Sequence, residues 1–219
     1  MKPESTPEAR IGSAVAGSIE LDGGLVHPSR LSRRVRSSPL RIMLYSHDTV
    51  GLGHFRRNLV LARALSGLES RPGILMLSGC AESSRFEMPE GVDVLTLPAL
   101  KKIGGGAYAS RSLDVSLRDL IAIRAEAIRA AVRSFEPDLL IVDNVPRGAE
   151  RELDATLEDL RKTGRTHVVL GLRDILDEPA AVKREWARLA NSEVIAAYYD
   201  SIWVYGDRRV ADLAEEYGF

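Results

Sequence analysis

The chain has a single cysteine among its 219 residues, so neither an intramolecular disulfide nor a cysteine metal cluster can form. We therefore expect a reducing compartment, the cytoplasm. An excess of either charge is also missing, because 30 Lys and Arg balance 31 Asp and Glu. This balance lacks the basic signature of nucleic-acid-binding proteins, so we expect no nucleic-acid partner. No apolar run reaches the roughly 18 residues that a membrane span requires.

Several catalytic motifs are absent as well. The glycine loop Gly51-Leu52-Gly53 is not followed by the lysine of a P-loop. The residue three positions past Gly53 is Arg56, where a dinucleotide-binding fingerprint has glycine. A nicotinamide cofactor is therefore not expected. The chain has no Gly-x-Ser-x-Gly nucleophile elbow. His47, Asp48 and His54 do not complete a spaced set of ligands, so we predict neither a metal nor another cofactor.

Residues 1–38 differ in composition from the rest of the chain. They are dominated by Pro, Ser, Gly and Glu without sustained periodicity, which predicts a disordered tail. The end of the tail is basic, with Arg30, Arg33, Arg34 and Arg36. Such an arm can attract anionic lipid by about 1 kcal/mol per charge, which suggests a peripheral contact with the inner face of the membrane. The alternative is a solvated arm with no partner.

From residue 39 onward, short apolar runs alternate with longer amphipathic segments. Strands are expected at residues 41–46, 73–78, 92–97, 139–143, 167–172 and 201–205. Helices are expected at residues 54–68, 115–135, 148–162, 179–199 and 208–217. Apolar strands separated by helices are typical of a parallel sheet covered on both faces. We predict one doubly wound, Rossmann-like α/β domain over residues 39–219.

The most informative segment is the glycine loop between the first strand and the first helix. Gly51 and Gly53 allow a ligand to approach the main chain, and the free amides that begin the helix attract anions such as phosphate. His54 lies in the first helical turn, where a neutral imidazole can act as a general base. Arg57 lies on the same helical face. We predict His54 as catalytic and the other three as substrate-binding; an ordinary tight turn is the alternative.

Further polar residues follow the fourth and fifth predicted strands. In the usual doubly wound order these strands lie beside the first, and ligands bind at the carboxyl ends where the order reverses. We therefore predict that Asp48, Asn144, Arg173 and Asp174 join His54 around one crevice as substrate-binding residues. Structural roles remain open, because Asp143 can cap a helix and Asp174 can pair with Arg173.

Residues 98–111 form a second candidate for ligand contact. This segment leaves the third strand, contains three consecutive glycines and carries Lys101, Lys102 and Arg111. A mobile cationic loop of this kind can close on a phosphate-bearing substrate, so Lys101 and Arg111 are predicted to bind substrate. The alternative is a solvated loop.

The stretch from Gly51 to Leu65, with its pattern Gly-x-Gly-His-x-x-Arg, resembles the first loop and helix of MurG-like glycosyltransferases of the GT-B fold. The match is nearest to predicted bacterial glycosyltransferases that carry this pattern. Residues 97–102, 171–176 and 203–207 resemble further blocks of that group. The resemblance covers about residues 40–219.

The resemblance implies transfer of a sugar from a nucleotide-sugar donor to a sugar or lipid-linked acceptor. Enzymes of this family have two Rossmann-like domains, of which the N-terminal one binds the acceptor and the C-terminal one binds most of the donor. We expect this chain to supply the acceptor-side domain only, to lack the donor-binding domain, and to be inactive by itself.

Two alternatives to the transferase remain open. The same pattern occurs in PseG-like nucleotide-sugar hydrolases, in which the histidine resembles a base that activates water. A noncatalytic acceptor-binding subunit of a split transferase is the other alternative. A hydrolase releases free sugar, a transferase requires an acceptor, and a recruiting subunit does neither without its partner.

Overall fold

The computed structural model describes residues 39–49, 51–103, 107–173, 176, 178–207, 209–210 and 212–217. The predicted tail at residues 1–38 and the predicted site residue Asp174 lie outside this described part. Among the described helices, none combines the length and the apolar character that crossing a membrane would require.

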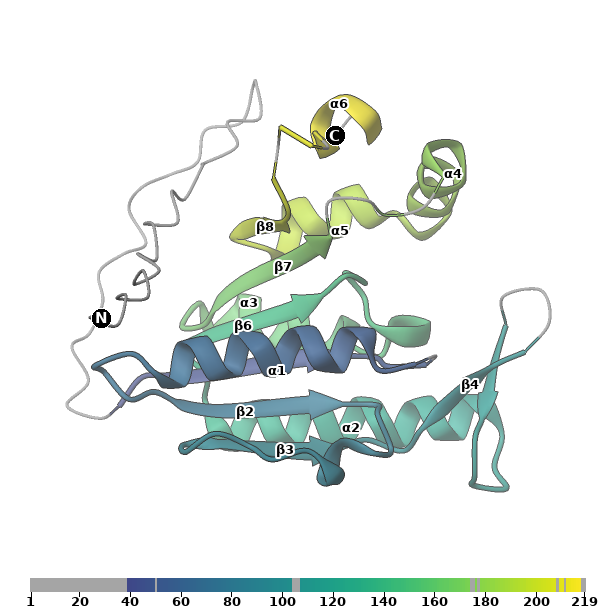
Figure 1. Ribbon diagram of the computed structural model, residues 1–219. Coiled ribbons are helices and arrows are strands. Elements are labelled where there is room, and N and C mark those ends of the chain that lie inside the picture. Colours follow the sequence, from purple (N-terminus) through teal and green to yellow (C-terminus); the bar gives the residue numbers. More distant parts are fainter. Residues whose placement is uncertain are drawn as a thin grey trace, which may run out of the picture. The chain divides into compact units, whose positions relative to one another are not determined.

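Six parallel strands form the central sheet in the order β3-β2-β1-β6-β7-β8 (Figure 1). They are β1 (Arg41–Ser46), β2 (Gly73–Ser78), β3 (Val92–Thr96), β6 (Leu139–Asp143), β7 (His167–Arg173) and β8 (Ser201–Tyr205). The strand order reverses between β1 and β6, which defines the switch point of a doubly wound sheet. The predicted Rossmann-like α/β fold is therefore confirmed.

Helices cover both faces of the sheet because alternate side chains of each strand point to opposite sides. Ile42 and Leu44 of β1 pack with Phe55 of α1 on one face, whereas Met43 and Tyr45 join the core under α2 and α3 on the other. The helices are α1 (Gly53–Ser66), α2 (Leu117–Phe135), α3 (Asp154–Thr163), α4 (Pro179–Leu189), α5 (Asn191–Tyr198) and α6 (Leu213–Tyr217), with short 3₁₀ turns η2 (Ser83–Arg85) and η4 (Ala149–Arg151).

The segment at residues 98–111 differs from the predicted loop. It contains an antiparallel hairpin of β4 (Leu100–Lys102) and β5 (Tyr108–Ser110). Leu100 is fully buried and packs with Leu120 of α2, so one apolar side chain anchors the hairpin to the domain. The expectation of an unstructured loop is therefore corrected for the described residues of this segment.

Two predicted helices are interrupted by residues with positive φ. The segment predicted at residues 179–199 divides into α4 and α5 at Ala190, whose φ of +52° is outside the helical range. The segment predicted at residues 148–162 begins its α-helix only at Asp154, because Glu150 has a φ of +49° and Arg151 a φ of +65°. Periodicity in the sequence does not reveal these breaks, because neither helix is interrupted by glycine or proline.

A buried ion pair ties four segments together on the α2 face. Arg124 of α2 is fully buried, and its Nε and Nη2 donate to the Glu152 carboxylate at 2.5 and 2.7 Å. Its Nη1 donates to the carbonyl oxygen of Pro98 at 2.7 Å. The Tyr45 hydroxyl of β1 donates to the same carboxylate at 2.5 Å. Both charges are paired and hydrogen-bonded, which is the condition under which buried charges are tolerated.

We predict that Arg124→Met destabilises the protein by about 3–5 kcal/mol, because Glu152 is left buried without its partner. The matched control is Arg129→Met in the same helix, which breaks a partly exposed, solvent-screened pair with Asp159 and should cost much less stability. Urea unfolding followed by circular dichroism measures both. Equal losses for the two variants would contradict the assignment of Arg124 as a structural centre.

Candidate functional site

The loop after β1 is held by Asp48, which is almost fully buried. Its Oδ1 accepts the amide of Phe55 at 2.9 Å, and so caps the start of α1. Its Oδ2 accepts the hydroxyls of Ser46 at 2.5 Å and of Ser78 at 2.7 Å. These bonds connect the ends of β1 and β2 to the helix. The carboxylate predicted to bind substrate therefore already has three donors inside the protein.

His54 lies in the first turn of α1, and its side chain is 22% exposed. Its Nδ1 lies 2.6 Å from Oδ2 of Asp143, the last residue of β6. A carboxylate can only accept, so Nδ1 carries the hydrogen and donates it. The other nitrogen, Nε2, then carries a lone pair, and no hydrogen bond to it occurs within the described residues. This arrangement of carboxylate and imidazole is that of an oriented general base.

Arg57 contacts the same carboxylate one turn further along α1. Its Nη1 donates to Oδ1 of Asp143 at 2.6 Å, so each oxygen of this fully buried carboxylate has a nitrogen donor from α1. The guanidinium carbon of Arg57 lies 5.6 Å from the ring centroid of Tyr205, at the end of β8. A Cβ at Gly171 would lie 2.1 Å from the Tyr205 hydroxyl, so only glycine leaves room for this ring.

The ring of His47 packs against the ring of His54. The two ring centroids are 4.8 Å apart, and the His47 side chain is almost fully buried. Burial, followed by the neighbouring His54, lowers the pKa of His47 to about 3. His47 is therefore neutral at physiological pH and presents an uncharged ring to His54.

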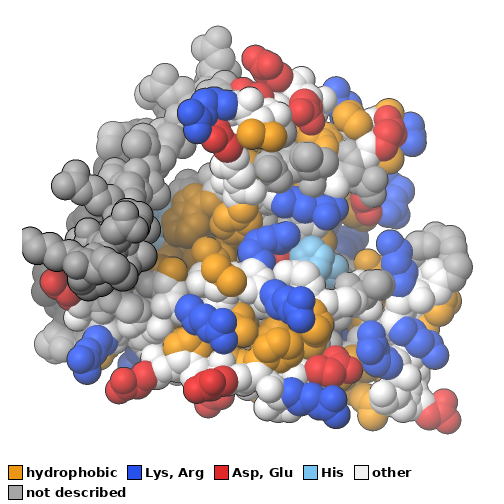
Figure 2. Space-filling model, viewed as in Figure 1, with side chains coloured by type: hydrophobic (Ala, Val, Ile, Leu, Met, Phe, Trp, Pro, Cys, Tyr) orange, Lys and Arg blue, Asp and Glu red, His pale blue; other side chains and the backbone are white. Residues whose placement is uncertain are grey.

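Of the predicted site residues, Asn144 and Arg173 lie at the same carboxyl edge of the sheet as His54, but the described side chains do not all meet. Asn144 directly follows β6 with a φ of +66°, and Arg173 ends the neighbouring strand β7. The exposed Arg173 donates to the carbonyl oxygen of Leu176 at 2.6 Å, and no hydrogen bond joins it to His54 among the described residues. Lys101 is exposed on β4. Figure 2 shows Lys and Arg side chains gathered around the histidine visible at this edge.

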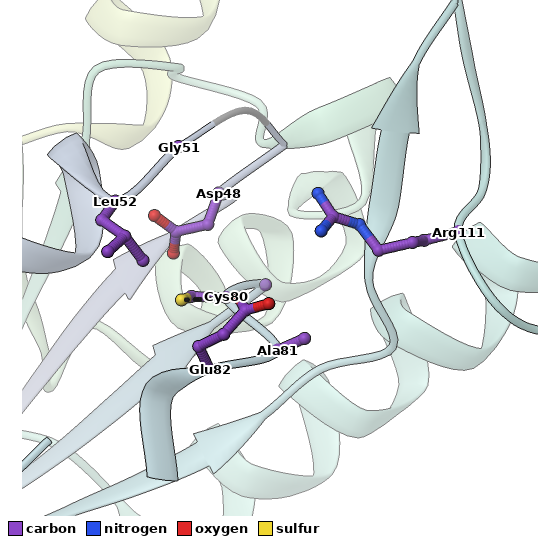
Figure 3. Close-up of a pocket in the computed structure, with 8 residues that line it drawn as sticks. Asp48, Gly51, Leu52, Cys80, Ala81, Glu82 and Arg111 are labelled. Atoms are coloured by element: carbon purple, nitrogen blue, oxygen red, sulfur yellow. Dashed lines mark hydrogen bonds between the residues drawn. The ribbon is translucent and has the colours of Figure 1, made fainter. Parts of the chain in front are cut away.

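A hollow of about 270 Å³ opens beside the glycine loop at the carboxyl ends of β1 and β2. It is lined by Asp48, Gly51, Leu52, Gly79, Cys80, Ala81, Glu82 and Arg111. Figure 3 shows the Arg111 guanidinium extending toward the loop, with Cys80 and Glu82 along the neighbouring wall. Arg111 also donates to the carbonyl oxygen of Thr49 at 3.3 Å, which holds the end of the hairpin segment against the loop.

Asp143, Tyr205 and His47 are the functional candidates that the sequence pattern does not single out. Asp143 ends an apolar strand that the usual topology places beside β1, and this position is the signal that points to it. Tyr205 and His47 have no such signal. Their importance follows from ring contacts with Arg57 and His54 that only the folded chain displays.

No protein-family model matches the chain, and no curated protein matches its sequence. Among solved structures, a sucrose-phosphate synthase from Thermosynechococcus elongatus is similar at 16% identity, with a TM-score of 0.45. The match covers 74% of this chain but only 41% of that protein. A similarity this weak carries no functional argument. The strand order itself defines the chain as a Rossmann-like α/β protein with its candidate site at the switch point.

The lowered pKa of His47 predicts how stability depends on pH. Between pH 6.5 and about 3 the unfolded chain binds a proton at this residue and the folded chain does not, so stability falls as the pH falls. When the pH is lowered from 7 to 4, we predict that the free energy of unfolding falls by about 3 kcal/mol less in His47→Phe than in the parent chain. Urea unfolding at the two pH values measures the difference. Parallel losses in both proteins would show that His47 is protonated in the folded state.

Proposed function

We propose that this domain is the acceptor side of a GT-B glycosyltransferase, in which His54 is the general base. The observation that carries the proposal is the 2.6 Å contact between His54 Nδ1 and the buried Asp143 carboxylate. It fixes the tautomer whose Nε2 can accept a proton at the carboxyl edge of the sheet. The identity of the transferred group as a sugar rests on the resemblance of residues 51–65 to MurG-like enzymes.

The proposed reaction is the transfer of a sugar from a nucleoside diphosphate to an acceptor hydroxyl. Nε2 of His54 takes the proton from an acceptor hydroxyl while the acceptor oxygen bonds to the anomeric carbon of the sugar. The bond from that carbon to the diphosphate oxygen breaks, and a nucleoside diphosphate leaves. Asp143 stabilises the imidazolium that forms and holds its orientation without taking the proton itself.

The glycine loop suits the phosphates of the donor. A Cβ added to Gly51 or Gly53 would meet nothing within 4 Å, so packing does not explain the absence of side chains there. Gly51 has a φ of +73°, which favours glycine, but Gly53 has no such conformational reason. The open space lies at the N-terminus of α1, whose first amides and partial positive charge favour an anion. Arg173, at the end of β7, adds positive charge at the same edge of the sheet.

The hollow beside the loop is the proposed binding site of the acceptor. Its lining combines a carboxylate and a guanidinium, Glu82 and Arg111, with the apolar Leu52 and Ala81. Hydroxyl groups can donate to the first and accept from the second, while the apolar side chains pack against a sugar ring. Gly51 and Leu52 line the hollow and lead directly to His54, which connects this binding site to the proposed base.

We predict that His54→Ala lowers kcat by about 10²–10⁴-fold with little change in stability, because the side chain is partly exposed and Arg57 still pairs with Asp143. The assay uses the full-length protein that the gene encodes, together with UDP-, GDP- and dTDP-sugars and a panel of sugar acceptors. It measures the nucleoside diphosphate that is released. The control is His167→Ala, at the opposite edge of the sheet, which should retain full turnover.

The products decide between the functional alternatives. Release of nucleoside diphosphate that depends on an acceptor supports the transferase. Equal release of free sugar with and without an acceptor would assign a nucleotide-sugar hydrolase, in which the same histidine activates water. Unchanged turnover and affinity in His54→Ala would contradict the role of His54 as a base.

A further inference from the structure

Arg57 is the part of the site whose surroundings disagree with phosphate binding. Its Nη1 donates a hydrogen bond to Asp143 Oδ1 at 2.6 Å, and its guanidinium lies over the Tyr205 ring. A phosphate-binding arginine presents its fork to solvent or ligand, whereas this one points to a fully buried carboxylate inside its own domain.

The position of Arg57 is built by three separate elements. Asp143 ends β6, Tyr205 ends β8, and Gly171 in β7 leaves the space that the Tyr205 ring occupies. The Tyr205 hydroxyl is buried and has no hydrogen-bond partner in the described part of the chain, so the ring rather than the hydroxyl makes its contacts here. This packing holds the guanidinium against Asp143.

The charges around His54 give Arg57 a specific effect. Asp143, from β6, is the negative group in contact with His54. Asp48, which follows His47, is also negative, but its carboxylate already accepts three hydrogen bonds inside the protein. The other groups that act on His47 or contact Asp143 and Arg57 are positive or neutral: Arg57 from α1, Tyr205 from β8, and Lys102 and Arg124. Without Arg57, His54 would be the one cationic partner left to the buried carboxylate among the described residues, and the carboxylate would favour the imidazolium.

We propose that Arg57 is a positioning residue that neutralises Asp143, so that Asp143 can orient His54 without drawing a second proton onto it. Arg57 thereby keeps the ring available as a base. The catalytic part of this inference rests on the proposed function, but the effect on His54 protonation does not, because it depends only on the contacts among these three side chains.

The test follows the His54 ring of the full chain by ¹⁵N NMR during a pH titration, with no substrate present. We expect Arg57→Gln to raise the pH midpoint of the His54 titration by at least about one unit, a tenfold gain in proton affinity. Arg57→Lys keeps the charge and should restore most of the parent midpoint. Arg56→Gln removes the adjacent exposed arginine and should leave the midpoint unchanged.

Circular dichroism reports whether Arg57→Gln folds, and a second variant provides the test if it does not. If Arg57→Gln does not fold, Tyr205→Leu removes the ring under the guanidinium and should raise the midpoint in the same direction by a smaller amount. An unchanged midpoint in the folded variant overturns the proposal.

Kinetics separate this inference from the proposed function. If the transferase is active, Arg57→Gln should lose up to about tenfold in kcat at pH values below the parent midpoint and regain it at higher pH, with KM for the nucleotide sugar unchanged. A tenfold rise in KM with an unmoved midpoint would make Arg57 a phosphate ligand instead. If the full-length protein that the gene encodes has no turnover but the midpoint moves, the role of Arg57 holds and the proposed function fails.

Discussion

The carboxylate of Asp143 is the charge that the rest of the site must satisfy. It lies fully buried at the end of β6, where an unpaired anion would be strongly destabilising. Both of its partners, His54 and Arg57, come from the first two turns of α1. The position of α1 is fixed in turn by Asp48, which accepts the amide of Phe55 and the hydroxyls that end β1 and β2. One chain of contacts therefore runs from the sheet through the glycine loop to the proposed base.

The sequence predicts the framework of this arrangement well because its signals are local. All six parallel strands are expected within one residue of their observed ends, because each is an apolar run bounded by polar or turn-forming residues. The usual strand order then brings the carboxyl ends of β1, β6 and β7 to one edge, together with Asn144, Arg173 and the loop that leads to His54. Elements that depend on one anchoring side chain are missed, as the β4–β5 hairpin and its buried Leu100 illustrate.

The partners within the site are harder to predict because they come from residues far apart in the chain. His54 and Asp143 are 89 positions apart, and the fit between Gly171 and Tyr205 depends on their register across β7 and β8. Local pattern also misleads about Arg57, since its spacing from His54 suggests a shared ligand whereas the two side chains share an internal carboxylate. Likewise, the sequence predicts Asp48 as a substrate-binding residue, whereas its buried carboxylate accepts three hydrogen bonds inside the protein.

The central claim is that Asp143 holds His54 with its hydrogen on Nδ1 and its lone pair on Nε2. The most direct measurement is a ¹⁵N-edited NMR spectrum of the His54 ring in the full chain at about pH 8. We predict the Nδ1–H tautomer in the parent protein, and a shift toward the Nε2–H tautomer in Asp143→Asn, because an amide can donate to Nδ1. The account would be contradicted if the ring carries its hydrogen on Nε2 in the parent protein. It would also be contradicted if the tautomer does not change in Asp143→Asn.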